Sequence, residues 1–155
     1  MARQNPSDIL ATDFLEALTK MSRKIRTAFN KQVTAHGLTY PRARALFRLA
    51  KTQNITQTEL ACELELEQAT LVRLLDRMEE NGLIERRQDP NDRRAKLIAL
   101  TRHGQEQAAF VRAIADQIRD QIFEGIAEAD IRQGLAVLDK ISANMADLEN
   151  VDVEK

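Results

Sequence analysis

Residues 56–82, "TQTELACELELEQATLVRLLDRMEENG", have the pattern of two short helices joined by a tight turn. Thr56 and Glu59 have the T-x-x-E spacing of a capping box, in which each side chain satisfies a backbone amide of the other residue. The first helix is predicted over residues 56–64. The second is predicted over residues 68–81, where an Asn-Gly pair gives a strong stop signal. Two helices with so short a connection are typical of a helix–turn–helix.

A β-hairpin is predicted directly after the second helix. The segments 83–88, "LIERRQ", and 95–100, "AKLIAL", read as short strands on either side of the charged stretch "DPNDRRAK", residues 89–96. A Pro-Asn pair in that stretch supplies turn chemistry. A helix–turn–helix followed by a hairpin predicts a winged helix–turn–helix.

Long helices are predicted on both sides of this region. Residues 8–36 carry apolar side chains at helical spacing, and residues 103–149 contain two further helices separated near Gly125. We therefore predict a mainly α (α+β) fold with a single domain over residues 1–155. Residues 37–102 form its winged region, and the flanking helices serve dimerisation.

The flanking helices have more apolar surface than a small winged domain can cover. A second copy of the chain is their natural partner, which predicts an intertwined homodimer. The alternative is a monomeric bundle in which these helices pack on the core of their own domain.

The composition limits the class of protein. The 155 residues are 43% hydrophobic and 30% charged, with Cys62 as the one cysteine, so an intrachain disulfide is impossible. The sequence has no membrane-spanning run and no apolar core of a signal peptide, which predicts a cytoplasmic protein with no membrane partner. It also has no glycine-rich phosphate loop, no metal-ligand spacing and no nucleophile–base pair. We expect no enzyme activity, no cofactor and no metal.

Charge is segregated along the chain although the net charge is only −1. Residues 17–58 contain nine Lys or Arg and no acid, whereas residues 103–155 contain five basic and eleven acidic residues. Residues 84–102 contain six basic and three acidic residues. Such asymmetry favours a polyanionic partner, with an ordinary variation in surface charge as the alternative.

The second helix of a helix–turn–helix places its N-terminal half in the DNA major groove. Arg73 is long enough for a bidentate contact to guanine, and Gln68 is suited to adenine. Thr70 can reach a base or a phosphate, and Ala69 can meet a thymine methyl group. For Arg73 and Arg77 the alternative is a solvated face with ion pairs to acids such as Asp76 or Glu80, which fits Arg77 better.

The hairpin tip is predicted to contact the minor groove. If the tip is extended, Asp92 and Arg94 lie on one face, and the carboxylate can orient the Arg94 guanidinium for insertion into a narrow groove. Arg93 would then contact phosphate or pack on the domain, and Lys96 belongs to the same basic stretch. The alternative is a polar turn with a local salt bridge.

Several of these stretches together resemble the MarR family of bacterial transcription regulators. They are "LTYPRARALFRLA" (38–50), "EQATLVRLLDRMEENGLIERR" (67–87), which is similar to the SlyA branch, and "DPNDRRAK" followed by L-T-x-x-G. The resemblance implies a dimeric winged helix–turn–helix that binds a palindromic promoter site and releases it when a small aromatic or phenolic anion binds. It places Thr70 and Arg73 in the major groove, and Arg94 with Asp92 in the minor groove.

Two positions depart from the family pattern. Glu65 stands in the turn where the family commonly has Gly, and a left-handed backbone there would strain it by roughly 1 kcal/mol. Ala69 stands where the SlyA branch often has proline.

By its placement in the family, the effector pocket would lie between the dimer helices and the winged region. An arginine with aromatic neighbours suits an aromatic carboxylate. The alternatives are plain core positions for the phenylalanines, a helix-end role for the histidine, and a phosphate contact for Arg44. The candidate residues are Arg26, Phe29, His36, Tyr40, Arg44 and Phe47.

The predicted function is a DNA-binding transcriptional repressor that acts as a homodimer on a palindromic site and responds to a small aromatic or anionic ligand. Alternatives are an effector-independent regulator, an antisilencer or a nucleoid-type DNA-binding protein. Cys62 is interpreted as a small buried hydrophobic residue in preference to a redox sensor, because it has no resolving partner in the chain.

Overall fold

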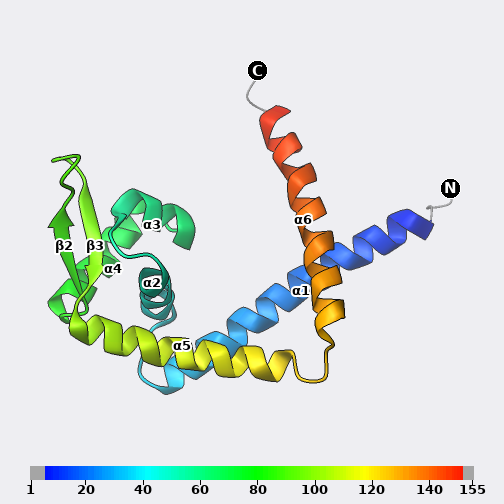
Figure 1. Ribbon diagram of the computed structural model, residues 1–155, viewed down its shortest axis with the longest axis horizontal. Coiled ribbons are helices and arrows are strands. Elements are labelled where there is room, and N and C mark those ends of the chain that lie inside the picture. The colour runs from blue at the N-terminus through cyan, green and yellow to red at the C-terminus, as the bar shows by residue number, and fades with distance from the viewer. Residues whose placement is uncertain (1–5, 152–155) are drawn as a thin grey trace. The chain divides into compact units, whose positions relative to one another are not determined.

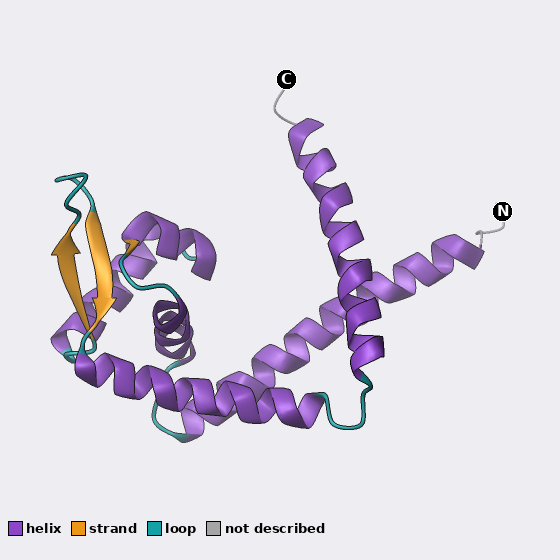
Figure 2. Cartoon of the chain, viewed as in Figure 1, coloured by secondary structure: helices purple, strands orange, loops and turns teal. Residues whose placement is uncertain are grey.

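The computed structural model describes residues 6–151 and is mostly helical, with one small sheet (Figures 1 and 2). The ends of the predicted domain, residues 1–5 and 152–155, lie outside the described residues. The chain forms two compact units, one ending at Ile118 and one beginning at Arg119. The first unit contains α1 (Pro6–Ala35), α2 (Tyr40–Lys51), β1 (Ile55–Thr56), α3 (Gln57–Leu64), α4 (Gln68–Glu80), β2 (Ile84–Gln88), β3 (Lys96–Leu100) and most of α5 (Arg102–Ile122). The second contains α6 (Glu128–Val151).

The first unit has the winged helix–turn–helix order that the sequence predicts. The hairpin of β2 and β3 follows α4 directly, and Figure 1 shows it beside the helix–turn–helix. The sheet is antiparallel in the order β1-β3-β2, with Ile84 opposite Leu100 and Gln88 opposite Lys96.

The prediction of only two strands in this region was incomplete, because β1 is a third. It has two residues and pairs Ile55 with Ile98 of β3. A strand this short has no alternating pattern to detect, and its place is set by pairing with a distant strand.

One apolar core holds the helix–turn–helix to the sheet. Leu46, Leu49, Leu60, Leu71, Leu75, Met78 and Ile98 are its largest fully buried members, together with Val33 of α1 and Val111 of α5. The outer face of α4 is thereby left free, since its leucines and its methionine face inward.

The predicted capping box at the start of α3 is confirmed. The Glu59 amide donates to the Thr56 hydroxyl at 3.2 Å, and the Thr56 amide donates to the Glu59 carboxylate at 2.9 Å. Hydrogen bonds from the Thr56 hydroxyl and then from its amide lower the pKa of Glu59, because they favour the ionised form.

The turn between α3 and α4 places Glu65 in the left-handed conformation, which costs free energy for a residue other than glycine. Glu65 has φ 54° and ψ 43°, and its amide donates to Cys62. The next amide, of Leu66, donates to Ala61 at 3.0 Å, and the Leu66 side chain packs against the core. The structure therefore carries the strain of about 1 kcal/mol expected for a non-glycine residue here.

The junction between the hairpin and α5 is unusually close. The Thr101 hydroxyl donates to the Gly82 carbonyl at 2.5 Å and accepts from the Gly104 amide at 3.0 Å. A Cβ atom on Gly104 would lie 1.8 Å from the Leu83 carbonyl oxygen. The T-x-x-G sequence thus combines an N-cap with the absence of a side chain at a main-chain contact.

The long helices expose large apolar side chains in the described chain. Those of α1 are Ile9, Leu10, Phe14, Leu15, Leu18, Met21 and Ile25, and those of α6 are Leu135, Val137, Leu138, Met145 and Leu148. None of the helices within residues 6–151 is long and apolar enough to cross a membrane.

Candidate nucleic-acid interface

The outer face of α4 carries the residues that the sequence assigned to the major groove. Leu71, Leu75 and Met78 are buried on the opposite face, which fixes the orientation of the helix. Ala69, Thr70, Arg73 and Arg77 therefore face solvent as one surface, and all four are exposed. Gln68 is exposed as well, at the first position of the helix, on the side that continues into Leu71 and Leu75.

Arg73 and Arg77 do not form the alternative ion pairs with nearby acids of α4. The Asp76 carboxylate accepts from Arg86 of β2 at 2.7 Å instead. Over residues 6–151, no ion pair or side-chain hydrogen bond engages the guanidinium group of Arg73 or Arg77. Both groups are available to an external acceptor.

The hairpin tip is a tight turn. The Ala95 amide donates to the Asp92 carbonyl at 3.0 Å, and the Arg94 amide donates to the Asp92 carboxylate at 2.9 Å. The expected contact between this carboxylate and the Arg94 guanidinium is therefore replaced by one to the main chain. The reason is that residues 92–95 turn instead of extending, so alternation along a strand does not apply.

The basic side chains of the tip point outward from this turn. Arg93, Arg94 and Lys96 are exposed, and Lys96 begins β3. The Gln88 side chain donates to the Arg93 carbonyl at 3.2 Å and holds the turn against β2. Two adjacent guanidinium groups are thus presented on a defined main chain.

Arg86 was not singled out from the sequence, and it links β2 to α4. Its guanidinium donates to Glu79 at 2.5 Å and to Asp76 at 2.7 Å, and its amide donates to Glu79 at 3.3 Å. Partial burial acts to lower the pKa of Arg86, but the hydrogen bonds and charges of Asp76 and Glu79 outweigh it and raise the pKa. The sequence does contain a signal for this contact: Arg86 follows the apolar Ile84 by two residues, and residues two apart on a strand lie on the same face.

Three of the predicted effector-pocket residues form a chain of contacts. The rings of Phe29 and Tyr40 meet edge to face at 6.0 Å, and the Arg44 guanidinium lies 5.8 Å from the Tyr40 ring centre. Arg44 also donates to the Leu64 carbonyl at the end of α3, at 3.1 Å. This chain connects the end of α1 to the turn of the helix–turn–helix.

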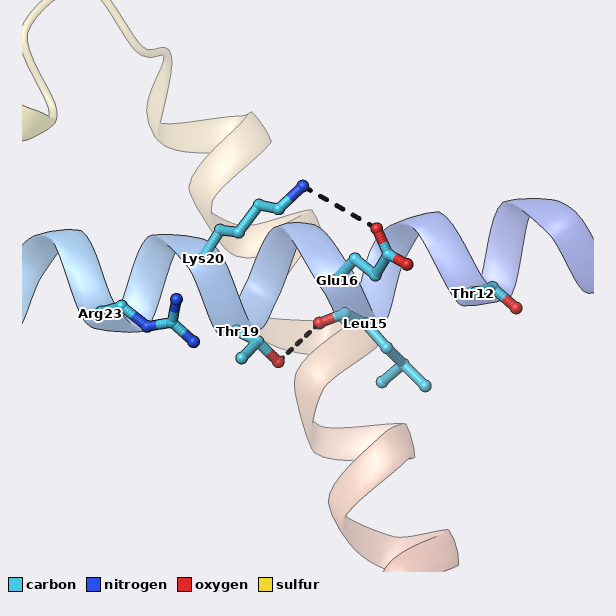
Figure 3. A pocket seen from close by; sticks show the side chains of 6 residues that line it. All are labelled: Thr12, Leu15, Glu16, Thr19, Lys20 and Arg23. Carbon is cyan, nitrogen blue, oxygen red and sulfur yellow. Dashed lines mark hydrogen bonds and ion pairs between the residues drawn. The ribbon is translucent and has the colours of Figure 1, made fainter.

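The other three candidates make different contacts. Arg26 lines a shallow hollow on α1 with Thr19 and Arg23, which also line the neighbouring hollow in Figure 3. His36 meets Phe110 edge to face at 5.0 Å, and its Nδ1 lies 2.8 Å from the Gln32 carbonyl. Phe47 packs partly buried against the core, with the Lys51 ammonium over its ring.

A second arginine of α2 also holds α3. Arg48, one turn after Arg44, forms an ion pair with Glu63. Arg48 and Glu63 were not singled out from the sequence, because they lie on different helices and their pairing depends on how those helices pack. Together the two arginines attach the last turn of α3 to α2.

Cys62 is exposed, so the expectation of a buried hydrophobic residue was wrong. Leu60, Ala61 and Leu64 occupy the inner face of α3, and residue 62 falls on the outer face. The sequence placed it in a helix without deciding the face of that helix.

The fold and this surface define a winged helix–turn–helix DNA-binding protein, with a free recognition helix and a basic hairpin beside it. Comparison with known proteins agrees: the MarR family model matches residues 38–96. The crystal structure of transcriptional regulator PA3341 is 36% identical, with a TM-score of 0.79 over 86% of this chain and 98% of that chain. The chain belongs to the MarR family and is a DNA-binding transcriptional regulator.

Other solved structures share the fold. A MarR-family regulator from Rhodococcus sp. RHA1 is 28% identical, with a TM-score of 0.70 over 90% of this chain and 97% of that chain. The transcriptional regulator SlyA is 24% identical, with a TM-score of 0.73 over 90% of this chain and 99% of that chain. At this identity the likeness to SlyA is one of fold, and the branch within the family stays a prediction.

Proposed function

We propose that this regulator binds a palindromic promoter site as a homodimer, represses transcription there, and releases the site when a small aromatic anion binds. The observation that carries the proposal is the free guanidinium of Arg73 on the outer face of α4, with Arg93 and Arg94 on the adjacent hairpin. In this proposal α4 enters the major groove, and the hairpin follows the neighbouring minor groove. The two half-sites lie about one helical turn apart, as a two-fold dimer requires.

Five exposed residues of α4 each have a role in the proposed complex with DNA. Arg73 makes a bidentate contact to guanine, and Gln68 pairs with adenine. Thr70 and Ala69 meet a base edge, a phosphate or a thymine methyl group. Arg77 lies one turn further along the helix and contacts the DNA backbone, which adds affinity without base preference.

The homodimer is supported by the apolar side chains that α1 and α6 expose. Leu10 is 72% exposed and Leu148 is 69% exposed, although both lie on helices rich in apolar residues. Surfaces of this kind are normally covered by a partner. A second copy of the chain satisfies both the exposed helices and the symmetry of a palindrome.

Light scattering of the free protein is expected to give twice the chain mass of 17.6 kDa. Leu138→Glu should give the mass of one chain, because a charge would be placed in an apolar interface. The matched control, Asp139→Asn, changes the adjacent exposed residue and should remain a dimer. A dimer of undiminished affinity in Leu138→Glu would place the interface elsewhere.

Release by a ligand is supported by the chain of contacts through Tyr40 and Arg44. A carboxylate is a better acceptor for the Arg44 guanidinium than the Leu64 carbonyl, and an aromatic ring fits beside Tyr40. A ligand bound there would release the end of α3. That change reaches the turn between the two DNA-binding helices.

Benzoate is expected to weaken DNA binding, and benzyl alcohol, which has the ring without the charge, is not. If the ligand binds only the DNA-free protein, the loss should be about 100-fold at 100 times its Kd for each ligand site that must be empty in the DNA complex. Fluorescence anisotropy of a labelled operator measures this, and Arg44→Gln should abolish the response. Equal DNA affinity with and without a panel of aromatic carboxylates would indicate an effector-independent regulator.

Arg94→Ala is expected to weaken binding most at operators with A·T-rich flanks, by about fivefold or more. The narrow minor groove of such flanks has an enhanced negative potential that attracts an inserted arginine. Affinities for operators with A·T-rich and G·C-rich flanks measure the difference, with Arg93→Ala as the neighbouring control that should lose equally on both. An equal loss on both flanks for Arg94→Ala would reduce its role to a phosphate contact.

A further inference from the structure

Arg86 lies on the face of β2 that meets α4. Side chains alternate along a strand, so Arg86 shares its face with the buried Ile84 and with Gln88. The neighbouring Arg87 lies on the other face and pairs with Glu85 of the same strand. Only the first of these two adjacent arginines connects the hairpin to another element.

The contacts of Arg86 are stronger than those of an ordinary surface ion pair. Its guanidinium forks between two carboxylates of α4, Asp76 and Glu79, which are three residues apart and therefore on one side of the helix. Its side chain is only 18% exposed, against 52% and 44% for the two acids. A partly buried guanidinium with two charged acceptors holds its geometry better than a solvated pair.

The connection continues from Arg86 to the hairpin tip. Gln88, on the same face of β2, donates to the Arg93 carbonyl within the turn. One face of β2 is therefore attached at both ends, to α4 through Arg86 and to the turn that presents Arg93 and Arg94 through Gln88. The spacing between the outer face of α4 and the tip depends on these two attachments.

We propose that Arg86 is a positioning residue that fixes the hairpin to α4, so that Arg73 and Arg94 reach the major and minor grooves at the same time. The inference rests on the proposed binding of DNA by both elements. A hairpin held in place loses little freedom on binding, whereas a loosened one must be ordered by the DNA itself. The contribution of Arg94 to affinity should therefore depend on Arg86.

The test is a double-mutant cycle on an operator with A·T-rich flanks. In the otherwise unchanged dimer, Arg94→Ala should lower affinity by about fivefold or more. In an Arg86→Gln background the same change should cost less than about twofold, because the loosened hairpin already contributes little. In an Arg87→Gln background, the matched control with the same loss of charge, the full effect should remain. An undiminished effect in Arg86→Gln overturns the proposal.

A second comparison separates position from charge, because Arg86 also neutralises two acids near the DNA. The triple variant Arg86→Gln, Asp76→Asn, Glu79→Gln removes both acids along with the arginine. If Arg86 acts by position, the Arg94→Ala effect stays small in this variant. A return of the full effect would show that Arg86 acts only by neutralising charge, and would overturn the positioning role.

Folding is checked by circular dichroism and thermal unfolding of each variant. Should Arg86→Gln fail to fold, Arg86→Lys replaces it, because lysine keeps the charge and loses the fork that bridges the two carboxylates. The same cycle then applies with the same contradicting outcome. An unaltered protein that does not bind DNA would contradict the proposed function, whereas DNA binding with an Arg94 effect independent of Arg86 would contradict only the positioning role of Arg86.

Discussion

Arg73→Ala is expected to lower affinity for the operator by about 1–3 kcal/mol and to relax the base preference at one position of each half-site. The physical reason is that a bidentate arginine discriminates guanine through two acceptors at once, and alanine leaves both without a partner. No acid within the described chain competes for this guanidinium, since Asp76 is engaged by Arg86. The loss should therefore appear in full.

The measurement is competition binding against operators that differ at each position. Arg77→Ala, on the same face of α4 one turn further along, is the matched control, and it should weaken all sequences about equally. An unchanged base preference in Arg73→Ala, with reduced affinity for every sequence, would show that Arg73 contacts phosphate.

Gly104→Ala is expected to destabilise the fold by about 3 kcal/mol, the upper end for overpacking a close contact. The added Cβ would lie 1.8 Å from the Leu83 carbonyl oxygen. The Leu83 oxygen belongs to the main chain, and the position of a Cβ atom is fixed by the main chain of its own residue. No rotamer change can therefore relieve the contact. The start of α5 would have to move, which breaks the hydrogen bonds of Thr101 to Gly82 and Leu83.

Chemical denaturation measures this loss as a shift of the unfolding midpoint. Gly134→Ala is the matched control, because a Cβ at that position of α6 meets nothing within 4 Å. It should leave stability unchanged or raise it by up to about 1 kcal/mol through helix propensity. Equal stability of the unaltered protein and Gly104→Ala would contradict the close junction.

The features that the sequence predicted well are local. The capping box of Thr56 and Glu59 and the helix stop before Gly82 each depend on residues within a few positions of one another. These features can therefore be predicted from the sequence without knowledge of the fold. The outward face of α4 followed as well, because the apolar spacing of the helix decides which side is buried.

The features that the sequence did not predict depend on packing between elements. Arg86 reaches acids seven and ten residues away, and Arg44 reaches a carbonyl twenty residues away. The tip was assumed to be extended, but the Asp92 carboxylate caps a turn. The same sequence is compatible with an extended tip and with a capped turn, and only the geometry of the hairpin decides between the two.

Sequence-specific binding by a symmetric dimer can be measured by selection from a random-sequence duplex library at near-physiological salt. We expect enrichment of a palindrome whose half-sites are centred about one helical turn apart. Binding without enrichment of any sequence, with a strong dependence on salt, would contradict this expectation and indicate a nonspecific DNA-binding protein.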